Sequence, residues 1–251
     1  MKVIRFEYQD KTGYGELEGE KIFLLDRSYL EENCKRTGEM VNLNEVKLLT
    51  PVQPSKIICV GLNYSKHIEE MGDILHEEPV IFLKPLTSLI GPEDEVIIPK
   101  MSNRVEYEAE LVVVVGKTLK DKAEDQVLDS IFGYTCGNDV TARDLQQKDG
   151  QWTRGKGFDT FCPIGPWIVT DLDVSELGIR SVLNGETKQS SNTKYFIHSV
   201  AKLISYISQV MTINPGDVIM TGTPEGVGPM KSGDKIVIEV EGIGQLRNKI
   251  G

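Results

Sequence analysis

Residues 105–116 constrain the fold of this 251-residue chain more than any other segment. Glu106, Glu108 and Glu110 alternate with other residues, and four consecutive valines follow at 112–115. Successive side chains of a strand point to opposite faces, so the glutamates should share one face of a strand that continues into the core. A carboxylate buried there needs a cation or a hydrogen-bond network. Because glutamate is seldom buried, three glutamates facing water on a half-exposed sheet are the simpler interpretation.

A further acidic position follows about thirty residues on. Residues 133–138 read as a short strand that turns into a helix, with Asp139 at the turn. Mg2+ and Mn2+ prefer oxygen ligands and keep positions open for water and substrate, so two glutamates and Asp139 would suit either ion. The three histidines have no HExxH spacing and the four cysteines no CxxC pair, so the sequence offers no better zinc site.

His67 and Glu70 lie three residues apart, after the apolar strand expected at 56–60. On a helical turn, residues at i and i+3 can touch. A carboxylate beside an imidazole fixes its tautomer and raises its basicity, which a general base requires. A surface helix with an ordinary histidine and glutamate would give the same pattern.

Six motifs taken together resemble the fumarylacetoacetate hydrolase family, in particular its acylpyruvase-like branch. They are GLNYSKHIEE at 61–70, FLKP at 82–85, EAEL at 108–111, NDVTARDLQ at 138–146, GKGFDTFCPIGP at 155–166 and PGDVIMTGTPEGVGP at 215–229. The resemblance implies an α+β, β-rich fold with a mixed β-roll. Expected strands near the N-terminus and the prolines at 51 and 54 predict a small N-terminal β module at 1–50, followed by the catalytic domain at 51–251.

The resemblance also implies roles for individual residues, with Glu106 outside the metal site and the dyad on a mobile lid. The implied ligands of Mg2+ or Mn2+ are Glu108, Glu110 and Asp139. The implied catalytic residues are the water-activating dyad His67 and Glu70, and Lys156, which would stabilise developing negative charge. The implied substrate-binding residues are Arg143, Gln146, Thr223 and Lys84.

The implied reaction is hydrolysis of a C–C bond in an acylpyruvate or a related β-diketo acid such as fumarylpyruvate. Water activated by the His67 dyad would attack the distant carbonyl, and the enolate of pyruvate would leave. The same enolate chemistry would serve a 2-hydroxyhepta-2,4-diene-1,7-dioate isomerase of aromatic catabolism or an oxaloacetate decarboxylase. A non-catalytic ligand-binding homologue is the alternative from another class, and the intact dyad disfavours it.

The net charge of the chain limits the kinds of molecule that it is expected to bind. A formal net charge of −10 disfavours nucleic acid, because phosphate would be repelled. A site for a small anionic keto acid must then be locally positive, and the metal, Lys84, Arg143 and Lys156 would make it so. No apolar stretch approaches the length of about 18 residues that a membrane span needs. Four cysteines without a pairing pattern fit a reducing cytoplasm, and the resemblance implies a homodimer.

Periodicity and turn residues predict the remaining elements. Val200, Leu203, Ile204 and Ile207 fall at helical spacing within a helix expected over 197–211. Asn184 and Gly185 predict a tight hairpin, and the prolines at 51 and 54 mark a hinge. Residues 62–78, which include Asp73, carry little apolar surface and predict a lid. N-terminal strands are expected near 2–9, 13–18 and 21–25.

Overall fold

A four-stranded antiparallel meander forms the N-terminal part of the protein, whose computed structural model describes residues 1–72 and 74–251. Three of its strands are those predicted from alternation. The fourth was not predicted, because nearly all of its residues are exposed and give no hydrophobic signal. The strands are β1 (Lys2–Tyr8), β2 (Lys11–Glu18), β3 (Lys21–Leu25) and β4 (Arg36–Asn42).

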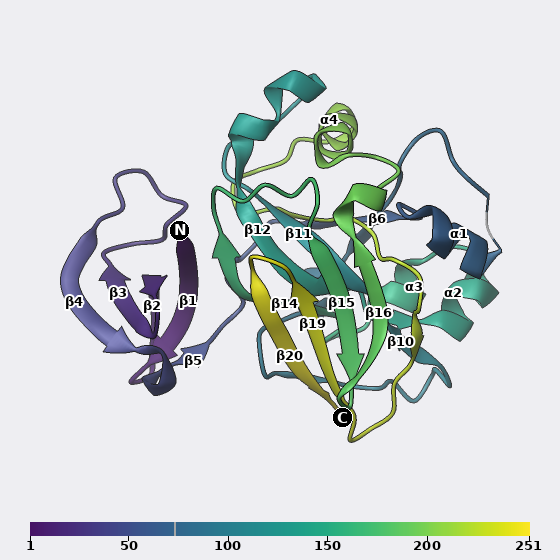
Figure 1. Ribbon diagram of the computed structural model, residues 1–251, viewed down its shortest axis with the longest axis horizontal. Coiled ribbons are helices and arrows are strands. Elements are labelled where there is room, and N and C mark those ends of the chain that lie inside the picture. The colour runs from purple at the N-terminus through teal and green to yellow at the C-terminus, as the bar shows by residue number, and fades with distance from the viewer. Residues whose placement is uncertain (73) are drawn as a thin grey trace.

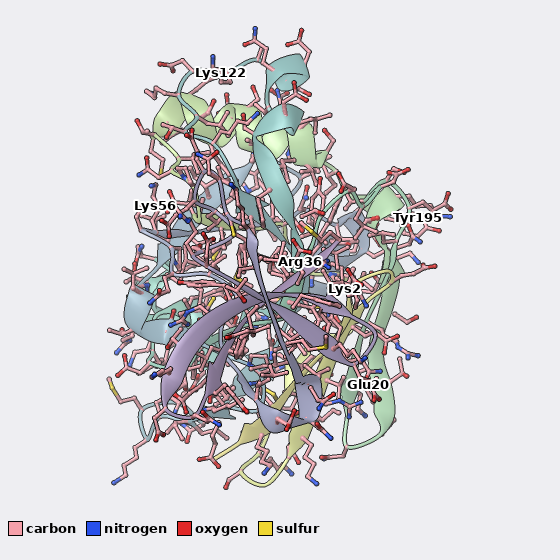
Figure 2. The ribbon with its side chains drawn as sticks, turned by 90° about the vertical axis from the view of Figure 1, so that its left-hand side faces the viewer. Lys2, Glu20, Arg36, Lys56, Lys122 and Tyr195 are labelled. Atoms are coloured by element: carbon pink, nitrogen blue, oxygen red, sulfur yellow. The ribbon has the colours of Figure 1, made fainter. Side chains whose placement is uncertain are left out.

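The meander shares a sheet with the rest of the chain. Strand β1 pairs antiparallel with β14 (Cys162–Val169), and the two-residue strand β5 (Lys47–Leu48) also pairs with β1. Figure 1 shows the meander at one end of the molecule and helices α1, α2 and α3 at the other. Figure 2 faces the meander end, where Arg36 of β4 is labelled. The boundary of an N-terminal module at residue 50 stays a prediction.

Strand β11 (Ala109–Val115) occupies the middle of the large sheet, between β12 (Ile131–Asn138) and β17 (Val218–Met220). It is buried on both faces: Leu111 and Val113 pack into one hydrophobic cluster, whereas Val112 packs into another. This explains a continuous run of β-branched residues, which is typical of a strand covered on both sides. The sheet ends with β6 (Ile57–Gly61) and β7 (Val80–Lys84).

A five-stranded sheet packs against the face of the large sheet that carries Leu111 and Val113. Its predicted hairpin turns at Asn184 and Gly185, whose φ angles of 52° and 86° are the positive values that a two-residue hairpin favours. Its strands are β16 (Glu186–Asn192), β15 (Gly178–Leu183), β19 (Lys235–Val240), β20 (Gly244–Ile250) and β9 (Glu95–Val96). A three-stranded sheet contains β13 (Thr141–Ala142), β10 (Val105–Tyr107) and β18 (Gly228–Pro229).

Helices are few, and the fold is α+β and rich in strands, as predicted. The predicted helix is present as α4 (Val200–Val210), with Leu203, Ile204 and Ile207 fully buried. Among the described residues, no helix is long and apolar enough to cross a membrane. The other helices are α1 (Ser65–Met71), α2 (Arg143–Asp149) and α3 (Thr153–Lys156). The short elements are β8 (Leu89–Ile90) and 3-10 turns at Leu43–Glu45, Leu86–Ser88, Glu124–Gln126, Leu128–Ser130 and Thr193–Tyr195.

Candidate metal centre and active site

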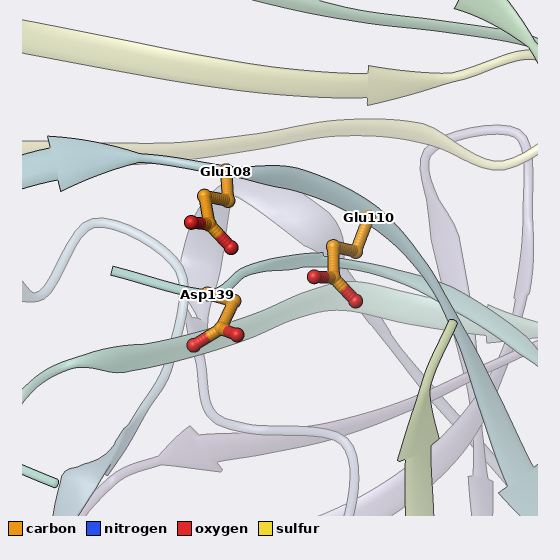
Figure 3. A group of neighbouring side chains, drawn as sticks. All are labelled: Glu108, Glu110 and Asp139. Atoms are coloured by element: carbon orange, nitrogen blue, oxygen red, sulfur yellow. The ribbon is translucent and has the colours of Figure 1, made fainter. Parts of the chain in front are cut away.

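Three carboxylates meet where β11 and β12 pair. Glu110 on β11 lies opposite Gly137 in the register, and Asp139 directly follows β12. The backbone N–H of Asp139 donates to the carbonyl of Glu108 over 2.9 Å, which holds the two residues side by side. Ligand oxygens of Glu108, Glu110 and Asp139 all lie within 4.8 Å of one another. Figure 3 shows the three side chains grouped together.

The single strand expected through the glutamates is interrupted at Glu108, so this part of the prediction was wrong. Residues before it belong to β10 in the small sheet and residues after it to β11 in the large one. The backbone N–H of Glu108 donates to the side-chain oxygen of Asn138 over 2.9 Å instead of joining a ladder. The water-facing interpretation also fails, because Glu106, Glu108 and Glu110 are at most 3% exposed.

Buried cations surround two of the three carboxylates. Lys156 Nζ donates to Glu108 Oε2 and to Asp139 Oδ2, at 2.7 Å each. Lys84 Nζ pairs with the other oxygen of Asp139, and Arg143 Nη2 with the other oxygen of Glu108. Burial opposes ionisation of Glu108, but Lys156 and Arg143 outweigh it and hold its pKa well below the ordinary range. Burial likewise opposes the charge of Lys156, yet Asp139 and Glu108 raise its pKa.

Among the described residues, no cation pairs with Glu110. Its Oε2 accepts one hydrogen bond, from the backbone N–H of Gly222 over 2.8 Å. Burial, followed by the charges of Asp139 and Glu108, raises the pKa of Glu110 well above its ordinary value. The cluster therefore lacks one positive partner, and three converging carboxylate oxygens are the donor set that a hard divalent cation prefers. The described residues fit such an ion.

The predicted contact within α1 is present. His67 Nδ1 lies 3.1 Å from Glu70 Oε2, and Glu70 also accepts from the backbone N–H of Gly226 at 3.0 and 3.2 Å. Glu70 is therefore held by the 222–229 loop while it orients the imidazole. Because Nδ1 faces Glu70, Nε2 is the ring nitrogen left for chemistry in the cavity. Asp73, part of the predicted lid, lies outside the described residues.

A cavity of about 220 Å³ brings these groups together. Of the predicted substrate-binding residues, Arg143, Gln146 and Thr223 line it, whereas Lys84 is not among the lining residues and contacts Asp139. Glu108, Glu110, His67 and Lys156 also line it. The remaining lining residues are Val60, Gly61, Leu62, Met71, Gln147, Gly150 and Trp152.

Sequence reasoning missed Trp152, which lines the cavity, and Gln189, which contacts the lining residue Thr223. Trp152 closes one side: a methyl group on Gly61 would come within 2.5 Å of the indole, so only glycine leaves it room. Gln189 on β16 donates to the Thr223 hydroxyl over 2.7 Å and accepts from the Ala109 N–H over 3.0 Å. Neither carries a local signal, since each acts through residues distant in the sequence.

Comparisons with known proteins assign most of the chain to one family. Residues 56–251 match the family described as fumarylacetoacetate (FAA) hydrolase C-terminal, and residues 1–51 match the Rv2993c-like N-terminal family. Protein Rv2993c of Mycobacterium tuberculosis is 51% identical over 85% of this chain and 82% of its own length. The mitochondrial oxaloacetate tautomerase fahd2 of Xenopus laevis is 40% identical, over 92% of this chain and 76% of its own.

Solved structures of other proteins share the fold over most or all of this chain. The crystal structure of 5-carboxymethyl-2-hydroxymuconate delta-isomerase from Mycobacterium smegmatis superposes with a TM-score of 0.94 at 44% identity, covering 100% of this chain and 99% of the other. Fumarylpyruvate hydrolase from Pseudomonas aeruginosa, in complex with Mn2+ and pyruvate, gives a TM-score of 0.75 at 34% identity. That match covers 80% of this chain and 94% of the other.

Proposed function

The chain belongs to the fumarylacetoacetate hydrolase family, and from that premise we propose that it is a divalent-metal-dependent enzyme that interconverts the keto and enol forms of a small 2-oxo acid. Oxaloacetate is the first substrate to test. The observation that carries the proposal is that three converging carboxylates and a histidine–glutamate pair line or adjoin one cavity of about 220 Å³. Glu108, Glu110 and Asp139 would hold Mg2+ or Mn2+.

The bound ion would polarise the 2-oxo group and make the neighbouring C–H more acidic. The protein would bind the anionic ends of the substrate with Arg143 and Lys156, which are the cationic side chains among the described lining residues. Thr223 adds a hydroxyl whose oxygen already accepts from Gln189, so its own O–H can donate into the cavity. With a divalent ion bound, an acidic protein would thus present a locally positive site.

His67 is the group we assign to proton transfer. Its Nε2 would take a proton from C3 of the keto acid, and Glu70, 3.1 Å from Nδ1, would stabilise the resulting imidazolium. Returning that proton to the 2-oxo oxygen yields the enol, and the reverse sequence yields the keto form. Atoms and charge balance over the cycle, and no attacking water is needed.

C–C hydrolysis of an acylpyruvate or fumarylpyruvate, which the sequence resemblance puts first, is the second candidate. The same dyad could activate a water, and a relative is named fumarylpyruvate hydrolase. Keto–enol interconversion is placed first because relatives at 40% and 41% identity are named oxaloacetate tautomerase, and a neighbour at 44% is named an isomerase. Isomerisation of a hydroxydienedioate would share the proton transfer, whereas decarboxylation of oxaloacetate would share only the stabilisation of an enolate. Homodimer formation stays a prediction.

The test uses the full chain, stripped of metal and reloaded with Mg2+ or Mn2+. Incorporation of solvent deuterium at C3 of oxaloacetate, followed by NMR, reports proton transfer, while a coupled assay for pyruvate reports cleavage of acylpyruvates or decarboxylation. We expect metal-dependent exchange that is much faster than pyruvate release. Rapid pyruvate release from an acylpyruvate with slow exchange would favour the hydrolase. Metal-independent background rates with every substrate would indicate a ligand-binding protein without catalytic activity.

A further inference from the structure

A line of ion pairs runs from the surface to a proposed metal ligand. Arg104 Nε donates to Glu106 Oε1 over 2.6 Å, and Arg143 Nε donates to Glu106 Oε2 over 2.7 Å. Arg143 Nη2 then pairs with Glu108. The Arg104 side chain is 57% exposed, whereas the Glu106 side chain is 1% exposed. Each oxygen of this buried carboxylate therefore accepts from one arginine. Arg143 lines the cavity, whereas Arg104 does not.

The Arg143 guanidinium is held at three of its nitrogens. Nε meets Glu106, Nη2 meets Glu108, and Nη1 donates to Gln146 Oε1 over 2.6 Å. A guanidinium carries five N–H donors, so two remain, one on each terminal nitrogen. Because the group is planar, contacts at three points determine where the two free donors point.

Without Glu106, the same guanidinium would have a competing arrangement. Nothing described would accept from its buried Nε, and an arginine can offer two parallel N–H groups to one carboxylate. Glu108, already in contact with Nη2, is the carboxylate within reach. Turning toward it would change where the two free donors of Arg143 point.

We propose, on the basis of the function proposed above, that Glu106 is a positioning residue that fixes Arg143 for binding a substrate carboxylate. Arg104 supplies the counter-charge on the solvent side, which lets a buried carboxylate remain fully paired. Glu106 itself is not among the lining residues of the main cavity and acts through Arg143. A merely structural role is the competing explanation, because Glu106 also sits in the β10 ladder opposite Thr141 and Pro229.

The experiment measures oxalate binding by calorimetry to the full chain in the presence of saturating Mn2+. Oxalate is used so that the result does not depend on which reaction the enzyme performs. Glu106→Gln keeps the shape but loses the charge and leaves one acceptor oxygen for two arginines. We expect oxalate to bind about 10-fold more weakly, the scale for losing a partner that orients a ligand-binding group. Mn2+ affinity, measured separately, should change less than about 2-fold.

Arg104→Gln should weaken oxalate binding less, by about 2- to 3-fold, because Arg143 keeps its contact with Glu106. This exposed residue also provides the test if Glu106→Gln does not fold. The matched control is Arg36→Gln on β4, an arginine that also pairs with two carboxylates, Glu16 and Glu18, at the meander end of the molecule (Figure 2). It should leave oxalate binding unchanged.

Several results would overturn the proposal. One is oxalate affinity unaltered in Glu106→Gln, or in Arg104→Gln when the first variant is unfolded. Parallel loss of Mn2+ and oxalate binding would instead place Glu106 in the metal site. A lower melting temperature with unchanged oxalate affinity would show that Glu106 has a structural role only. Failure of the proposed function looks different: wild-type protein would bind oxalate yet not exchange C3 of oxaloacetate.

Discussion

The two sides of the candidate active site are built in opposite ways. On one side, Glu106 of β10 and Glu108, which follows it, pair with Arg143 of α2 and Lys156 of α3, beside Glu110 of β11. Each of these residues is at most 3% exposed. On the other side stands α1, a helix of seven residues of which His67 and Ile68 are the buried ones. We call these the charged wall and the α1 wall.

The energies of the two walls differ accordingly. Removing one partner of a buried ion pair typically costs about 3–5 kcal/mol, because a charge is left unpaired away from water. An exposed pair such as Lys66 with Glu225, 3.7 Å apart, is worth about 0–1 kcal/mol. The charged wall should therefore hold its geometry without ligand, whereas the α1 wall can shift at little cost.

The largest effect is expected from Glu110→Gln, which tests whether the charged wall needs a metal. Metal affinity should fall by more than about 100-fold and activity should be lost with it, because a carboxylate ligand has become a neutral amide. Calorimetry with Mn2+ and the exchange assay measure the two. The matched control is Glu225→Gln, in the loop after β17, whose surface pair contributes little. Full activity in Glu110→Gln would refute the site.

The same substitution should stabilise the metal-free protein. Burial raises the pKa of Glu110 in the folded state, so the unfolded chain loses this proton at lower pH. Stability of the metal-free protein therefore falls as pH rises between the unfolded and the folded pKa of this group. Glu110→Gln is neutral at every pH, and should raise the melting temperature at pH 7.5 by about 2–4 °C for each kcal/mol recovered. A melting temperature lower than that of metal-free wild type would contradict this account.

Lys156→Met is expected to have the next largest effect. Glu108 and Asp139 each lose a cation at 2.7 Å, so the metal-free protein should unfold several degrees earlier. Added Mn2+ should restore part of the loss because it binds the same carboxylates. Turnover should remain about 100-fold down, the scale for removing a group that stabilises developing charge.

Lys56→Met provides the matched control for that prediction. Lys56 also pairs with a buried carboxylate, Asp217, and neither residue lines the cavity. It should lower the melting temperature whether or not Mn2+ is present, and leave turnover alone. If Mn2+ rescued both variants equally, the charged wall would not be the place where metal acts.

His67→Ala tests the α1 wall and should cost about 100-fold in C3 exchange, the usual scale for losing a general base. Glu70→Gln should cost less, since the imidazole remains and only its orientation and charge stabilisation suffer. Neither variant should change Mn2+ affinity, because neither residue is one of the proposed metal ligands. Weakened Mn2+ binding in His67→Ala would show that the two walls are not separate.

Much of this architecture could be predicted from local pattern. The valine run of β11, the spacing in α4 and the Asn184–Gly185 turn each depend on the residues of one segment, and the structure has all three elements. The contact of His67 with Glu70 follows from helix geometry in the same way. Motif resemblance then supplied what local pattern could not: which carboxylates come together.

What stayed out of reach depends on contacts between distant residues. Gln189 binds the backbone of Ala109, 80 positions earlier, through strands of different sheets. The break of the strand at Glu108 depends on the side chain of Asn138. The alternation of residues within 105–115 predicts neither contact, because both partners lie elsewhere in the sequence. The pairing of Glu106 with Arg104 and Arg143 was missed for the same reason, since alternation shows the face of a carboxylate but not its partner.

The smallest effect, and the most direct test of the comparison, is expected in amide hydrogen exchange. Helix α1 has no side-chain cap at its N-terminus, and its contact with the 222–229 loop includes the Gly226 N–H bonded to Glu70. Such a helix should open locally at a small fraction of the global unfolding free energy. Oxalate bound with Mn2+ should slow exchange in α1 by about 10-fold, equivalent to about 1.4 kcal/mol, whereas amides of β11 should already be protected in the free protein.

Glu70→Gln should weaken the acceptor for Gly226 and speed exchange in ligand-free α1, with no change in β11. If α1 were as protected as β11 without ligand, both walls would be rigid, and closure of α1 over the substrate would have to be abandoned.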